Sequence, residues 1–397
     1  MLYGVTYPEG FRAAGICAGI KKNNKLDLAA IISDRPASAA ALFTKNVIKG
    51  HSLLLSRKHI SCGTARLVLM NSGCANACLG ERGEMDALRY AMAGAQAVGC
   101  PVNHVLPQST GVIGKPLPID ALIQGVHTAC THASKDHGID AAMAIMTTDT
   151  HPKMAQDECI IDGKTVKIGA MAKGSGMIHP NMATMLCLIT TDAALTSAAA
   201  DKALRSAASI TLNRISVDGD TSVCDQATLL ANGLAGNRML QVEDPELNRF
   251  TEALCDILDK LARMLAADGE GATKLLEIRV RGAENDSAAH IIAASIARSP
   301  LCKTAAYGND ANWGRLITAA GYSGVDFNPN TVNIWIGPLM VCENGTALPF
   351  SEAEALALLK QKEVVYTLDF RMGKGKDTMY TCDFSHDYIS INAEYRT

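Results

Sequence analysis

The stretch KGSGMIHPNMATMLCLITTDA, residues 173–193, joins a glycine-containing loop directly to an apolar run. Two glycines and a Pro-Asn pair come first, and the β-branched and apolar residues of TMLCLITTD follow at 184–192. A phosphate-binding P-loop ends in Gly-Lys-Ser/Thr and leads into a helix, so neither this stretch nor the later DGEGATK (268–274) has that pattern. The stretch is therefore either a connection into a buried strand or a place where Thr184 acts as a nucleophile.

The neighbouring segments predict an α+β layered sandwich. Apolar periodicity predicts long helices at 84–99, 197–215 and 244–269, the last with Asp244 as N-cap before Pro245. Strands are predicted at 26–34, 65–71, 158–172 and 184–192, with a hairpin turn at Asp162-Gly163. Because the hairpin requires antiparallel pairing and the order of elements is irregular, mixed β-sheets flanked by helices fit better than a strictly parallel sheet.

The last part of the chain predicts a smaller C-terminal α/β subdomain at about 277–397. Its segments are shorter, and they surround one predicted helix at 351–361. The predicted strands are LEIRVRG, TVNIWIG, VVYTLDF and DYISINAEY.

Composition excludes several classes of protein. The 397 residues carry a net charge of only −3, so no basic surface for nucleic acid or an anionic membrane is expected. No secretory signal or membrane-spanning run is visible, and a cytoplasmic protein is expected. The 13 cysteines lie in contexts such as MLCLI, where Cys behaves as a small buried hydrophobe, so no disulfide framework is predicted.

A threonine hydroxyl is a weak nucleophile unless a base lies close to it. If the peptide bond before Thr184 is cut, the new α-amine, whose pKa is roughly 7.7–8.0, can accept the hydroxyl proton. The same hydroxyl can make the cut by attacking the carbonyl of Ala183, and the small residues upstream permit a tight backbone there.

Several blocks of sequence together resemble the ornithine acetyltransferases, self-cleaving arginine-biosynthesis enzymes that transfer an acetyl group from N-acetylornithine to glutamate. The resemblance runs through the whole chain in the expected order. The matching blocks are NSGCANACLG (71–80), PQSTGVIGKPLP (107–118), MTTDT (146–150), KGSGMIHPNMATML (173–186), NRISVDGDTSVCD (213–225), DGEGATK (268–274), GNDANWGR (308–315) and INAEYRT (391–397).

The resemblance implies a mechanism and a set of site residues. It implies Thr184 as the nucleophile, Ala183-Thr184 as the bond that is cut, and Thr110 with Gly111 as the oxyanion hole. The implied substrate-binding residues are Thr147, Lys173, Thr184, Glu270, Asn392 and Thr397. Lys173 can pair with a substrate carboxylate and Glu270 with an ammonium group.

The resemblance also implies an assembly. Residues 1–183 would form an α segment and residues 184–397 a β segment, which stay together as a heterotetramer of two α and two β segments. The fold is expected to be like that of self-processing aminopeptidases, with two mixed sheets between helices.

The expected partners are N-acetylornithine and glutamate, and acetyl-CoA for those family members that also make N-acetylglutamate afresh. No cofactor and no metal are expected, because Cys74 and Cys78 lack a second ligand pair. An N-terminal-nucleophile amidohydrolase or aminopeptidase on the same fold is the alternative enzyme. A non-catalytic binding protein is the alternative from another class.

Overall fold

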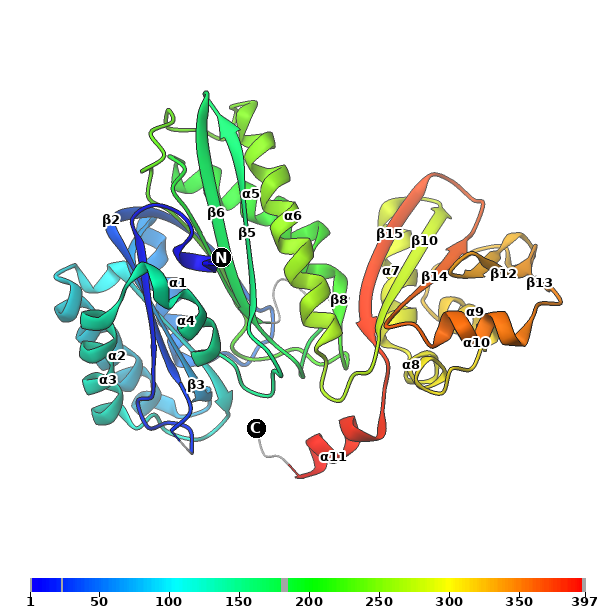
Figure 1. The fold of residues 1–397 in the computed structure, drawn as a ribbon, viewed down its shortest axis with the longest axis horizontal. Helices are drawn as coiled ribbons and strands as arrows, with labels where there is room; N and C mark the ends of the chain where they lie inside the picture. The colour runs from blue at the N-terminus through cyan, green and yellow to red at the C-terminus, as the bar shows by residue number, and fades with distance from the viewer. Residues whose placement is uncertain (1, 23, 180–184, 395–397) are drawn as a thin grey trace.

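Two β-sheets, each with its own helices, lie side by side in the computed structural model, which describes residues 2–22, 24–179 and 185–394 (Figure 1). Helix α11, near the C-terminus, leaves the second unit and reaches back beneath the first (Figure 1). The C-terminal segment is thereby brought toward the first unit.

The first sheet is mixed. Its order is β4-β3-β2-β9-β7-β6-β5, with β1 paired to β2 off this path. β7 runs parallel to β9 and antiparallel to β6, and β3 is parallel to β4. The strands are β1 (Phe11–Ile16), β2 (Leu28–Phe43), β3 (Thr64–Cys74), β4 (Val105–Val112), β5 (Lys153–Ile161), β6 (Lys164–Lys173), β7 (Leu186–Thr191) and β9 (Gln226–Ala231).

Alternate residues of the strands face two different layers. Ala40 and Leu42 of β2 belong to one core with helices α5 and α6, whereas Ala39 of the same strand packs in another core with α4. A third core lies beneath α2 and α3. The helices of this unit are η1 (Gly4–Thr6), α1 (His51–His59), η2 (Ile60–Cys62), α2 (Gly80–Val98), η3 (Val102–His104), α3 (Ile119–His132), η4 (Lys135–His137), α4 (Gly138–Ala144), α5 (Ser197–Ile210), η5 (Leu212–Arg214) and α6 (Glu246–Ala267).

The second sheet is also mixed and has the order β13-β12-β11-β14-β10-β15-β8. Its edge strand β8 (Ile215–Ser216) comes from the middle of the chain and pairs parallel with β15. The other elements are β10 (Leu275–Ala283), α7 (Asp286–Arg298), α8 (Pro300–Tyr307), α9 (Trp313–Gly321), η6 (Pro329–Thr331), β11 (Asn333–Ile336), β12 (Leu339–Glu343), β13 (Thr346–Ala347), α10 (Glu352–Leu359), β14 (Glu363–Asp369), β15 (Gly375–Cys382) and α11 (His386–Glu394).

The predicted α+β class with mixed, helix-flanked sheets is confirmed, and so is the hairpin at Asp162-Gly163. β5 and β6 pair antiparallel on either side of these two residues, which have φ values of 57° and 71°. Two successive positive φ values characterise the tight turns that match the twist of a hairpin, and Asp and Gly tolerate them best.

Other sequence predictions are wrong in detail. The helix predicted to reach 215 ends at Ile210, and 3-10 helix η5 and strand β8 follow it. Asp244 does not cap α6: its carboxylate accepts the backbone N–H of Gln241 at 2.6 Å, in the turn before the helix. The C-terminal unit has α7, α8 and α9 in addition to the predicted helix, and the sequence analysis missed these three.

DYISINAEY (387–395) was predicted as a strand, but its described residues, 387–394, belong to α11. Its alternating apolar residues suggested a half-buried strand, yet Ile389 is 67% exposed and the helix lies outside both sheets. The alternating apolar side chains therefore have no sheet face against which they could be buried.

Candidate active site

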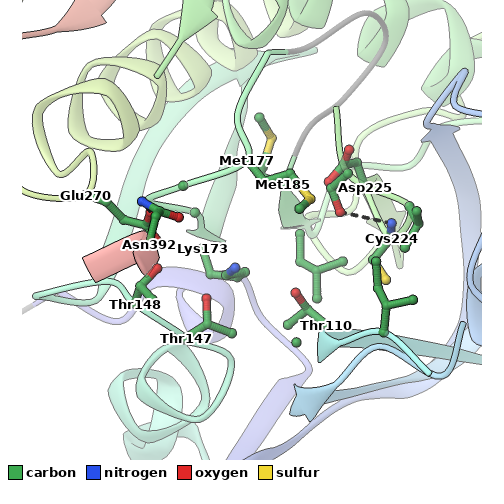
Figure 2. A pocket seen from close by; sticks show the side chains of 17 residues that line it. Thr110, Thr147, Thr148, Lys173, Met177, Met185, Cys224, Asp225, Glu270 and Asn392 are labelled. Carbon is green, nitrogen blue, oxygen red and sulfur yellow. Dashed lines mark hydrogen bonds between the residues drawn. The ribbon is translucent and has the colours of Figure 1, made fainter. Parts of the chain in front are cut away.

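A cavity of about 100 Å³ lies where the ends of β4 and β6 and the start of β7 meet (Figure 2). Among the described residues, six of the positions predicted from the sequence line it. These are Thr110, Gly111, Thr147, Lys173, Glu270 and Asn392. They come from five separate parts of the sequence, so the fold has gathered them at one place.

The remaining predicted residues, Ala183, Thr184 and Thr397, lie outside the described residues. Met185, which directly follows Thr184 in sequence, lines the same cavity, and its carbonyl accepts the N–H of Gln226 at 2.8 Å. The roles of all the predicted site residues, including the nucleophile, stay predictions.

Gly111 lies at the end of β4 in a conformation that favours glycine. Its φ is +124°, and a Cβ there would come within 2.6 Å of the backbone of Gly73 and Cys74 on β3. Thr110 is buried, with 8% exposure, and its hydroxyl has no hydrogen-bond partner among the described residues. A hydroxyl and a glycine amide are thus held together on a strand end, which is a suitable arrangement for binding an oxyanion.

Two opposite charges lie on the other side of the cavity (Figure 2). Lys173, at the end of β6, and Glu270 are only 8% and 6% exposed, yet within the described ranges neither forms an ion pair. Asn392 of α11 donates its amide N–H to Oε2 of Glu270 at 2.8 Å. The Lys173 charge acts on Asp149 without forming an ion pair with it, and both Lys173 and Glu270 line the cavity, where opposite charges of a ligand can pair with them.

Gly176 makes room for the Glu270 carboxylate. A Cβ on Gly176 would lie 2.3 Å from Oε2 of Glu270, so a larger residue would displace the carboxylate. The Glu270 amide also donates to the carbonyl of Ser175 at 3.1 Å. The glycine-containing loop that follows β6 therefore holds this acid in place.

A buried charge cluster, Asp149–Lys153–Asp268, supports the loops behind the cavity. The ammonium of Lys153 lies 2.7 Å from Oδ1 of Asp149 and 2.5 Å from Oδ2 of Asp268. Asp149 also accepts the N–H groups of Thr147 and Gly174, at 2.9 and 2.7 Å. Burial alone would raise the pKa of Asp149, but the charges of Lys173 and Lys153 hold it well below its usual range.

Asp225 adds a different kind of acid to the cavity wall. Its side chain is fully buried, and burial raises its pKa well above the usual range even though Ser222 and Lys173 oppose the shift. Its Oδ2 has no hydrogen-bond partner among the described residues. The cavity wall thus contains a buried carboxyl group whose pKa is raised by its burial.

Sequence reasoning missed Asp149, Lys153, Asp225 and Asp268 as parts of the site. Three of them were inside or at the end of recognised blocks: MTTDT, NRISVDGDTSVCD and DGEGATK. Lys153 had no such signal, because it lies before the predicted strand at 158–172 and a lone lysine is usually on the surface.

The described residues include no group of three or more His, Cys, Asp or Glu side chains able to hold a metal ion. None of the helices in those ranges is long and apolar enough to cross a membrane. The 13 cysteines are free thiols.

The sheets and this cavity define an α+β protein with a small, charged pocket at the end of its strands. The family model described as the ArgJ family matches residues 12–397. The chain therefore belongs to the ArgJ family, which confirms the resemblance seen in the sequence.

Individual relatives match almost the whole chain. The arginine biosynthesis bifunctional protein ArgJ of Symbiobacterium thermophilum is 48% identical over 396 residues, covering 99% of this chain and 98% of that protein. The protein of the same name from Geobacillus kaustophilus is 45% identical, covering 99% and 96%. A crystal structure of ArgJ from Bacillus halodurans has a TM-score of 0.51 and 44% identity, and covers 52% of this chain and 98% of that one.

Proposed function

We propose that this protein transfers an acetyl group from N2-acetylornithine to glutamate through an acetyl ester on Thr184, formed after the Ala183-Thr184 bond is cut. The activity class follows from the family: the chain is an acyltransferase of arginine biosynthesis, as predicted. The hydrolytic alternative on the same fold is not favoured. The observation that carries the mechanism is the convergence of Thr110, Gly111, Lys173 and Glu270 on one cavity.

The first half-reaction forms the acetyl-enzyme. The Thr184 hydroxyl attacks the acetyl carbonyl, and the α-amine of Thr184 takes the hydroxyl proton. The Thr110 hydroxyl and the Gly111 N–H stabilise the resulting oxyanion, and a donor of this kind is commonly worth about 2.7–4 kcal/mol of barrier. The carbon–nitrogen bond then breaks, the proton passes to the leaving amine, and ornithine departs.

The second half-reaction reverses these steps with glutamate. Its amine attacks the acetyl ester, and N-acetylglutamate leaves. Lys173 binds the α-carboxylate that both amino acids present, and Glu270 binds the side-chain ammonium of N-acetylornithine. The reaction needs no cofactor. We include acetyl-CoA as a second acetyl donor, because the relatives are named bifunctional proteins.

The first sheet explains how the cut segments would stay together. β7, from the second segment, pairs with β6 of the first segment over six residue pairs, and β9 pairs with β2 over another six. Cutting the chain would leave these hydrogen bonds in place. The Bacillus halodurans chain, which covers only 52% of this one, has the length that one such segment would have.

We extend the proposal to a cytoplasmic tetramer of two α and two β segments, which sedimentation would distinguish from a single α–β pair.

Steady-state kinetics tests the mechanism. Varying N-acetylornithine at several glutamate concentrations should give parallel double-reciprocal lines, because ornithine leaves before glutamate reacts. Intersecting lines would contradict the acetyl-enzyme, and acetate release without glutamate at the full rate would point to the hydrolytic alternative.

A further inference from the structure

A second cavity, of about 630 Å³, lies between the two units. One wall is the end of α5 with the following η5, and the other is a face of α7. Lys45 and His179 reach it from loops. Because it is several times larger than the candidate active site, it has room for a whole small-molecule ligand.

Three side chains that line this cavity, Lys45, Arg214 and Arg298, carry a positive charge. Lys45 and Arg298 are exposed, and within the described ranges neither forms an ion pair. Arg214 and His290 both bind the same carboxylate, at 2.6 and 2.7 Å from the two oxygens of Asp377. Asp377 is only 1% exposed, whereas the Arg214 and His290 side chains are 26% and 44% exposed. The acid therefore lies beneath, and the Arg214 guanidinium faces the cavity.

One further acid, Asp286, lies at the start of α7 on the rim. Its Oδ1 accepts the backbone N–H of Lys376 at 2.9 Å, so part of its charge is already engaged.

The pKa of His179 indicates the sign of the electrostatic potential in this cavity. Burial, followed by the charges of Arg298 and His290, lowers its pKa to about 4, and Asp220 opposes this with a smaller effect. Such a potential favours an anion over a cation.

The cavity also has an apolar part. Ile210 of α5 and Ile291 of α7 line it and are 46% and 43% exposed. Large aliphatic side chains beside several cations suit a ligand that has both a flat apolar group and phosphate groups. We propose that this cavity binds a phosphate-bearing nucleotide, with its phosphates on Lys45, Arg214 and Arg298 and its base between Ile210 and Ile291.

Two kinds of ligand carry such a group: acyl-CoA, at its nucleotide end, and a free nucleotide. The cavity adjoins the candidate active site, since Met177 lines one and His179 lines the other. Their Cα atoms are at most about 7 Å apart along the chain. The Asp218 carboxylate fixes this segment by accepting the N–H groups of Met177 and Ile178, at 2.6 and 2.9 Å. The acyl-CoA source rests on the proposed function, whereas nucleotide binding does not.

Calorimetric titration of the purified full chain tests the proposal with four probes: CoA, adenosine 3′,5′-bisphosphate, pyrophosphate and adenosine. We expect the first two to bind, pyrophosphate to bind more weakly, and adenosine not to bind measurably. The variant Lys45→Gln/Arg298→Gln should raise the dissociation constant of the bisphosphate at least about tenfold, because two charge-assisted contacts are lost. The matched control is Arg57→Gln/Lys58→Gln, which removes one Arg and one Lys from the exposed face of α1 and should change nothing.

Competition distinguishes the two sources. Inhibition by adenosine 3′,5′-bisphosphate of glutamate acetylation from acetyl-CoA, but not from N-acetylornithine, would assign the site to acyl-CoA. Binding without this inhibition would assign it to a free nucleotide. Absence of saturable binding by either nucleotide, or equal affinity in both double variants, would overturn the proposal. Exchange between N-acetylornithine and glutamate, measured in the same preparations, reports separately on the proposed function.

Discussion

Removing Lys153 should destabilise the protein far more than removing a comparable surface lysine. The Lys153 ammonium lies 2.7 Å from Asp149 and 2.5 Å from Asp268, and the three side chains are 0%, 0% and 4% exposed. Lys153→Met leaves two carboxylates buried without their shared cation. Breaking a buried pair in this way costs about 3–5 kcal/mol of unfolding free energy.

Lys260→Met is the matched control. Lys260 also pairs with an aspartate of β5, Asp157, at 3.1 Å, but these side chains are 52% and 40% exposed. An exposed pair is worth about 0–1 kcal/mol, so the two variants should differ by about 3 kcal/mol. Urea unfolding at pH 7, followed by circular dichroism, measures both. Equal destabilisation, or a loss below about 1 kcal/mol for Lys153→Met, would refute the reasoning.

The pH dependence provides a second test of the same cluster. The pKa of Asp149 is depressed in the folded protein, so its contribution to stability is present above the unfolded pKa of about 3.9 and is lost as the pH falls through the folded value. In Lys153→Met, burial still raises the pKa of Asp149, but that lysine no longer opposes the effect. The loss of unfolding free energy in the variant should therefore become smaller as the solution is acidified and the carboxylates become protonated.

The Lys153→Met variant should also show a raised KM for N-acetylornithine, because Asp149 holds the amides of Thr147 and Gly174.

Three further predictions concern the rest of the site. Gly111→Ala should lower kcat at least about a hundredfold, because its Cβ would strike the backbone of Cys74, whereas Gly321→Ala, at the exposed end of α9 with open space around its Cβ, should stay within a few-fold of wild type in the same assay. Thr110→Val should lower kcat/KM by about 10²–10³, and Thr110→Ser should restore most of the rate if the hydroxyl is the donor. The pKa of His179 is depressed to about 4, so its stabilising contribution is present above about pH 6.5 and lost as the pH falls through 4. His179→Gln should therefore lose less unfolding free energy than wild type between pH 7 and 4, and equal losses would contradict this.

The sequence predicted the parts of the fold in which local signals agree with the tertiary structure. Strand β7 has a continuous apolar run, and all six of its residues are buried between neighbouring strands. The Asp162-Gly163 turn has a local sequence signal that no distant contact alters. Prediction failed where the structure depends on distant contacts. DYISINAEY has the apolar alternation of a strand, but its described residues pair with neither sheet and belong to α11.

The candidate site shows the same limit. Family blocks identified Thr110, Lys173 and Glu270, and the fold brings these residues to one cavity. The supporting charges could not be predicted, because an interaction such as Lys153 with Asp268 joins residues 115 positions apart. Neither could the raised pKa of Asp225, which follows from its burial rather than from its neighbours in sequence.

The central claim is that Thr184 becomes a new N-terminus and then carries the acetyl group. An intact-mass spectrum of the denatured wild-type protein, taken before and after incubation with N-acetylornithine without glutamate, tests it most directly. The account predicts two fragments whose masses sum to the full chain plus one water, with the fragment that begins at Thr184 gaining one acetyl group. A single uncut species in folded, active protein, or an acetyl group on the other fragment, would contradict it.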